Sequence, residues 1–130
     1  MLWIAGFAIG TASHLLELLR FGFLPYRFAP APFNLFWTAL VLIDPLVVLL
    51  LLTFRRAGLV LGAATMLADA AANSYTVYGL GHSELYGPLQ MQTLFLGFVL
   101  GSFAFLGPND NNSILRRPSA PLASAPRRGP

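Results

Sequence analysis

The sequence predicts an all-α fold, namely a bundle of four transmembrane helices in up-down-up-down order. Of the 130 residues, 56% are hydrophobic and only 10% are charged, and the mean hydropathy is +0.67. A soluble domain carries about 25% charged residues. The chain also contains four apolar stretches of nearly the length, about 20 residues, that a helix needs to cross a bilayer. The connections between them are short, which favours antiparallel neighbouring helices.

The four predicted spans form one domain over residues 1–107. They lie at about residues 2–19, 33–54, 57–80 and 88–106. The segments between them contain residues that interrupt helices. These are Gly22, Pro25, Pro30 and Pro32 in the first connection, the Arg55-Arg56 pair in the second, and Gly81, Gly87 and Pro88 around the third.

The arginines predict the orientation of this bundle. Six of the eight, four of them in the tail, fall on the side that holds both termini and the second connection, whereas Arg20 and Arg27 fall on the other side. Cytoplasmic loops carry the excess of arginine. We therefore expect a multi-pass protein of the bacterial inner membrane with both termini in the cytoplasm. Residues 108–130 are polar, basic and rich in proline, and they are predicted to form a disordered cytoplasmic tail.

Composition also excludes several kinds of site. The chain has no cysteine, which excludes disulfides and thiolate chemistry. The net charge of +3 comes from connections and tail, so we predict no nucleic-acid partner. His14 and Glu17 form an HxxE pair on one helix face, but no second histidine lies near them, and zinc needs three protein ligands. No metal or cofactor is predicted.

Helical periodicity places small and polar residues together on three of the spans. On the first span the face comprises Gly6, Gly10, Ser13, His14 and Glu17; on the third it comprises Gly58, Gly62, Thr65, Asp69, Asn73 and Thr76. On the fourth span, Thr93, Gly97 and Gly101 form a ridge of small residues. Such residues let helix backbones approach closely. We expect all three faces to point away from lipid, either within the bundle or in a homo-oligomer.

Two of the acids lie near the middle of predicted spans. Asp69 is in the third span, and Asp44 precedes Pro45 in the second, where the proline is expected to kink the helix. An aspartate at that depth costs about 2.5–3.5 kcal/mol on insertion scales. Side chains that are so expensive usually serve a partner, an ion or a substrate.

The depth of each residue in its span predicts one polar cluster inside the bundle. Its members are Asp44, Asp69, Asn73, His14 and Glu17. We take Asp69, Asp44, Glu17 and His14 as candidate catalytic residues. As candidate ligand-binding residues we take Asn73, Trp37, Tyr75, Thr65 and Thr76. Of the two aspartates, the sequence favours Asp69 as the functional one, because it shares its face with several polar residues. A purely structural role is the alternative, in which Asp69 pairs with Asn73, Asp44 caps the kink and Glu17 pairs with Arg20.

Two stretches resemble known membrane proteins. They are LPYRFAPAPFNLFWTALVLIDPL, residues 24–46, and LADAAANSY, residues 67–75. They resemble a bacterial family of small four-span membrane proteins over about residues 14–80, a resemblance that implies no function. More distantly, the chain is similar to the emopamil-binding and sterol-isomerase-like superfamily. That resemblance implies that His14, Glu17 and Asp44 surround a sterol-like or cationic amphiphile, with Asn73 and Tyr75 matching an asparagine and an aromatic residue of a later helix.

The leading hypothesis is an intramembrane pocket of histidine and carboxylates for a lipophilic, sterol-like or terpenoid-like ligand. Acid–base isomerisation or cyclisation is the chemistry that such a pocket suits. One protonated carboxyl would protonate a double bond, a carboxylate would take up a proton, and the ring of Trp37 would face a carbocation. Two alternatives stay open: a proton-coupled transporter or channel subunit, and a non-catalytic assembly protein. Whether the protein is an enzyme is also open. Membrane lipid is a further expected partner.

Overall fold

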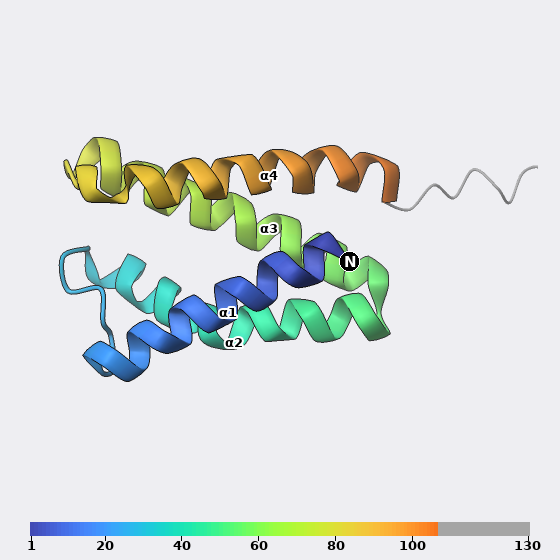
Figure 1. Cartoon of the computed structure of the whole chain (residues 1–130), viewed down its shortest axis with the longest axis horizontal. Coiled ribbons are helices and arrows are strands. Elements are labelled where there is room, and N and C mark those ends of the chain that lie inside the picture. Colours follow the sequence, from blue (N-terminus) through green and yellow to red (C-terminus); the bar gives the residue numbers. More distant parts are fainter. Residues whose placement is uncertain (107–130) are drawn as a thin grey trace, which may run out of the picture.

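The computed structural model describes residues 1–106, and the regular structure within this part of the chain is entirely helical (Figure 1). The four α-helices are α1 (Leu2–Phe21), α2 (Ala31–Thr53), α3 (Arg55–Ser74) and α4 (Tyr86–Leu106). A π-helical segment, η1 (Tyr75–Gly79), continues α3, and a short 3-10 helix, η2 (Ser83–Leu85), precedes α4. The all-α prediction is thus confirmed for the described residues. The predicted tail, residues 108–130, lies outside them.

Three segments are long and apolar enough to cross a membrane: Leu2–Phe21, Ala31–Thr53 and Ser83–Phe105. The helix α3 is not one of them. It begins with Arg55 and Arg56, and it contains Asp69 and many alanines and glycines, which contribute little apolar surface. The structure therefore confirms a helical protein with three candidate spans. That α3 also crosses the membrane stays a prediction.

Consecutive helices run in opposite directions, and each packs against the next (Figure 1). The helix α3 is sandwiched between α2 and α4. Its small residues allow this close approach, because a methyl group on Gly58 would lie 2.5 Å from the backbone nitrogen of Leu51 in α2. The inward face predicted for this helix is confirmed, since Gly58, Gly62, Thr65 and Thr76 are all buried.

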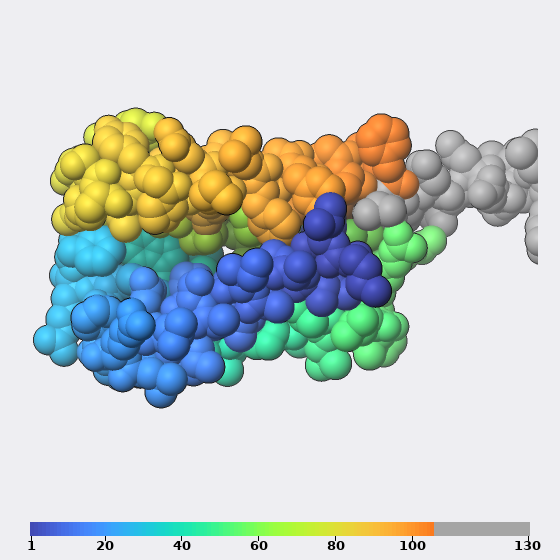
Figure 2. Space-filling view, in the orientation of Figure 1, coloured from blue at the N-terminus to red at the C-terminus, as the bar shows by residue number. Residues whose placement is uncertain are grey.

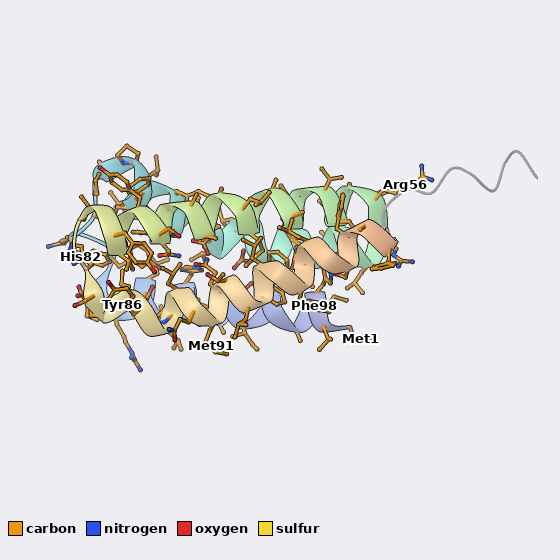
Figure 3. All side chains as sticks on the ribbon, turned by 90° about the horizontal axis from the view of Figure 1, so that it is seen from above. Met1, Arg56, His82, Tyr86, Met91 and Phe98 are labelled. Atoms are coloured by element: carbon orange, nitrogen blue, oxygen red, sulfur yellow. The ribbon has the colours of Figure 1, made fainter. Side chains whose placement is uncertain are left out.

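The main core lies toward the end of the bundle that holds Met1 and Arg56; Figure 3 shows these two residues opposite His82 and Tyr86. It is built from all four helices. Its buried members are Trp3, Phe7, Val47, Leu59, Ala63, Met66 and Val99. At this end α1 and α4 are joined, because the indole N–H of Trp3 donates to Ser102 Oγ at 2.8 Å.

The ridge predicted on the fourth span is not where we expected it. Thr93, Gly97 and Gly101 do not face the core: both glycines are exposed, and a methyl group added at either would meet nothing within 4 Å. The inward face of α4 instead contains Leu89 and Val99, which are 5% and 0% exposed. Within the bundle the prediction was wrong, because this helix is apolar on every side and periodicity does not define which side faces the other helices. Contact of this ridge with a second copy in a homo-oligomer stays a prediction.

Candidate functional site

A groove runs between α1 and α4, and its floor is formed by α2 and α3 (Figure 2). The two bordering helices touch near one end, where the rings of Phe7 and Phe95 lie 6.1 Å apart and Phe95 fills the space beside Gly6. At the other end the two interhelical loops meet, with the rings of Phe28 and His82 5.0 Å apart. Between these contacts Figure 2 shows a hollow that exposes the deeper helices.

Two adjoining cavities make up the groove. The first cavity has a volume of about 420 Å³ and the second, closer to the loops, about 350 Å³; they share Ser13, His14 and Pro88. The polar side chains around the first cavity are Ser13, His14, Asp44, Thr65, Asp69 and Gln92. Those around the second are Ser13, His14, Glu17, Tyr26, Trp37 and Asn73.

The side chain of Asp69 is the centre of a hydrogen-bond network. Its Oδ1 accepts from Trp37 Nε1 at 3.0 Å and from Asn73 Nδ2 at 3.1 Å, while Oδ2 accepts from Gln92 Nε2. Asn73 Nδ2 also donates to Gln92 Oε1 at 2.8 Å. One carboxylate thus ties α2, α3 and α4 together, and three N–H donors compensate its burial.

Asp44 is in a different environment. It is 5% exposed, it faces the first cavity, and it has no hydrogen-bond partner among the described residues. Gly10 allows α1 to pass over it, since a methyl group there would lie 2.5 Å from Asp44 Oδ2. The helix α2 continues through Pro45, whose missing N–H leaves the carbonyl of Val41 without its helical partner. This carboxyl group is therefore available to a molecule in the groove.

A third polar group, formed by His14, Glu17 and Tyr26, joins α1 to the loop that follows it. His14 Nδ1 lies 2.6 Å from the hydroxyl oxygen of Tyr26, and 3.9 Å from Glu17 Oε2. Burial raises the pKa of Tyr26 above its usual range, and the negative charge of the nearby Glu17 raises it further. The side chain of Asn34 fixes the loop, because its Oδ1 accepts from the backbone N–H of Tyr26 and its Nδ2 donates to the carbonyl of Leu24, both at 3.1 Å.

Aromatic rings surround the loop end of the groove. Trp37 is 3% exposed and lies 5.2 Å from the ring of Tyr26, 6.0 Å from that of Phe33 and 6.1 Å from that of Phe28. Both Trp37 and Phe28 line the second cavity. The tryptophan ring is thus held by packing and by its bond to Asp69, so its orientation is fixed before any ligand arrives.

No known protein family, curated protein or solved structure matches this chain. The family resemblances suggested by the sequence therefore stay predictions, and the function is inferred from the geometry of the groove.

Most residues that the sequence selected do line the groove. They are His14, Glu17, Trp37, Asp44, Thr65, Asp69 and Asn73. Two others do not. Tyr75 packs on Phe33 at 5.5 Å between ring centres, on another side of α3, and Thr76 is fully buried with its hydroxyl bonded to the carbonyl of Ala72.

Sequence reasoning missed Tyr26 and Gln92. Tyr26 lies in a connection, and no helical periodicity relates it to His14. Gln92 is a strongly polar residue within an apolar stretch, which was a usable signal. The loop pair His82 and Glu84, joined at 2.7 Å, lines neither cavity.

The charge of the groove is acidic. Asp44, Asp69 and Glu17 line it, and among the described residues no arginine lines either cavity. No group of three or more metal-ligating side chains occurs within residues 1–106. Apolar side chains complete the first cavity, among them Ile9, Met66, Met91 and Phe95.

Proposed function

We propose that this protein binds a lipophilic molecule with a basic or positively charged group in the groove between α1 and α4, and performs acid–base chemistry on it. The observation that supports this most directly is Asp44, which is buried and has no hydrogen-bond partner in the described part of the chain. A carboxylate that faces an apolar groove without a partner is unfavourable, because little water reaches it. A ligand that donates a hydrogen bond or brings a positive charge removes that cost on binding.

The lining of the groove supports the class of ligand. Three acids and no arginine among the described lining residues favour a cation or a neutral molecule and disfavour fatty acids and anionic lipids. Apolar contacts from Ile9, Met66 and Phe95 suit a hydrocarbon or terpenoid body. A groove bordered by two apolar helices also gives such a molecule a direct way in from the bilayer.

The chemistry that suits this site is isomerisation or cyclisation of a double bond. With a neutral alkene as substrate, Asp44 is protonated and transfers its proton to an alkene carbon, which forms a C–H bond and a carbocation; the carboxylate left behind then faces a positive charge, as it does with a basic ligand. The ring of Trp37 stabilises the positive charge. A base in the groove then removes a proton from a neighbouring carbon, and the electrons of that C–H bond form the new double bond. The contact between Gly6 and Phe95 closes one end of the groove, which favours this function over a channel.

Binding is tested with neutral red, a lipophilic weak base, added to the purified protein in a neutral detergent. We expect Asp44→Asn to weaken binding at least about tenfold, because the amide cannot neutralise a cation. The matched control is Glu84→Gln, which makes the same chemical change on an exposed loop. Equal affinity in wild type, Asp44→Asn and Glu84→Gln would contradict the proposal. Mass spectrometry of lipids that copurify with wild type but not with Asp44→Asn then identifies the natural ligand.

The proposed topology has four spans in the inner membrane and both termini in the cytoplasm. The helix α3 is too polar to insert by itself, and its packing between α2 and α4 brings it across. Because the chain has no cysteine, single-cysteine variants test this cleanly. In intact cells, an impermeant thiol reagent should label Ser83→Cys but not Ala57→Cys; the reverse pattern would mean the opposite orientation.

A further inference from the structure

One threonine, Thr65, differs from the other threonines of the described chain. Each of the others donates its hydroxyl to the backbone carbonyl four residues earlier; they are Thr11, Thr38, Thr53, Thr76 and Thr93. The hydroxyl of Thr65 has no partner among residues 1–106, although this residue is only 7% exposed. Because no fully enclosed side-chain oxygen in this part of the chain lacks a hydrogen bond, the Thr65 hydroxyl must reach the first cavity, which it lines.

The packing of α2 against α3 places Thr65 opposite Asp44. These helices run in opposite directions, and a methyl group added at Gly62 of α3 would lie 3.1 Å from a methyl carbon of Val47 in α2 (Figure 1). Three residues further along each helix, Gly62 leads to Thr65 and Val47 leads back to Asp44. Residues three apart share a helix face. The hydroxyl and the carboxyl group are therefore at one level on facing helices, and both line the same cavity.

This pair lies at a closed end of the groove. One helical turn away, toward the end that holds Met1, Gly62 packs against the rings of Trp3 and Phe7, and this layer is apolar. The helix α1 covers the pair itself at Gly10, where a methyl group would lie 2.5 Å from Asp44 Oδ2. A polar group of a ligand that reaches the pair is thus enclosed by three helices, while the rest of the ligand extends along the groove.

We propose that Asp44 and Thr65 together bind a primary ammonium group at the end of the lipophilic ligand, with one N–H donated to each residue. This inference rests on the proposed function and names the class of its basic ligand. The carboxylate and the hydroxyl oxygen both accept hydrogen bonds, and a primary ammonium has three N–H donors. A tertiary ammonium has one, which Asp44 takes, and a quaternary ammonium has none. Thr65 therefore determines which ammonium groups the groove prefers.

The test is competition with neutral red by three amphiphiles that share a decyl chain: decylamine, N,N-dimethyldecylamine and decyltrimethylammonium. All are cations at about pH 7, so they differ in their number of N–H donors. Comparing wild type with a variant for each amphiphile, at one detergent concentration, cancels its partition into micelles. Thr65→Val keeps the shape of the side chain and removes the hydroxyl. We expect it to weaken decylamine binding at least about tenfold and to change the binding of the other two less than about twofold.

Thr38→Val is the matched control, because the Thr38 hydroxyl bonds to the carbonyl of Asn34 and this residue lines neither cavity. It should leave all three affinities unchanged, and Thr65→Ser, which keeps a hydroxyl, should retain the preference for decylamine. An equal loss for all three amphiphiles in Thr65→Val, or no loss for decylamine, would overturn the inference and leave the proposed function standing. Decanol competing as well as decylamine would also overturn it. If no amphiphile displaces neutral red from the wild type, the proposed function fails together with this inference.

Discussion

The Asp69 network makes a prediction about stability that differs for the two buried aspartates. Four hydrogen bonds connect Trp37, Asp69, Asn73 and Gln92. In Asp69→Asn, one carboxylate oxygen becomes an N–H donor, and the existing donors must be rearranged. If the amides of Asn73 and Gln92 both rotate, three bonds can form: Trp37 to residue 69, residue 69 to Gln92, and Gln92 to Asn73.

The variant therefore loses one hydrogen bond and the negative charge that strengthened the others. Hydrogen bonds to charged groups contribute about 1.5–3 kcal/mol each. We expect Asp69→Asn to lower the free energy of unfolding by about that amount. Asp44→Asn breaks no hydrogen bond among the described residues and removes a buried charge, so we do not expect it to destabilise the fold.

The assay is unfolding in mixed micelles as SDS is added to a mild detergent. Tryptophan fluorescence reports it, because Trp3 and Trp37 are both buried. A double-mutant cycle with Gln92→Ala provides the stricter test, since Asp69→Asn should cost less when its partner is already missing. Equal stability of Asp69→Asn and wild type, or additive effects in the cycle, would refute the network as the source of the effect.

Two further predictions concern close packing and the first loop. Gly58→Ala should destabilise the bundle by about 1–3 kcal/mol, because its methyl group meets the backbone of α2. Gly97→Ala should be neutral or slightly stabilising, because a methyl group there meets nothing. Equal effects of the two changes in the SDS titration would place both glycines in similar surroundings. Asn34→Ala removes the two hydrogen bonds that fix Leu24 and Tyr26, so amide hydrogen exchange across residues 22–30 should become faster without a change in α4. Unchanged exchange in that loop would mean that Asn34 does not hold it.

The two aspartates also differ in the function we assign to them. The sequence favoured Asp69 because polar residues share its helical face. In the structure, however, Asn73 of that face donates hydrogen bonds to Asp69 and to Gln92. Asp44, which the sequence associated with its own proline, is the carboxyl group left open to the groove. Our proposal therefore gives Asp69 the role of holding Trp37 and the helices in place, and gives Asp44 the role of meeting the ligand.

The sequence by itself determined where the helices lie along the chain and that most of them are apolar enough for a membrane. The predicted spans lie within about two residues of the helical segments, because long apolar stretches and the glycines and prolines between them are local signals. The polar faces of the first and third helices were also readable, since those helices combine small, polar and apolar residues at the helical period. The inward position of Gly62 and Thr65 follows from that pattern.

Only the tertiary structure decided how these faces are used. The helix α4 has no distinct apolar face, so its rotation is set by packing and by the bond between Gln92 and Asn73, which turns Gly97 outward. Tyr26 meets His14 because Asn34 holds the loop that carries Tyr26. This contact joins a helix residue to a loop residue, so helical periodicity does not predict it. Hydrogen bonds between helices depend on how the helices are placed in space, which the spacing of residues along one helix does not determine. These bonds satisfy Asp69 and leave Asp44 open to the groove.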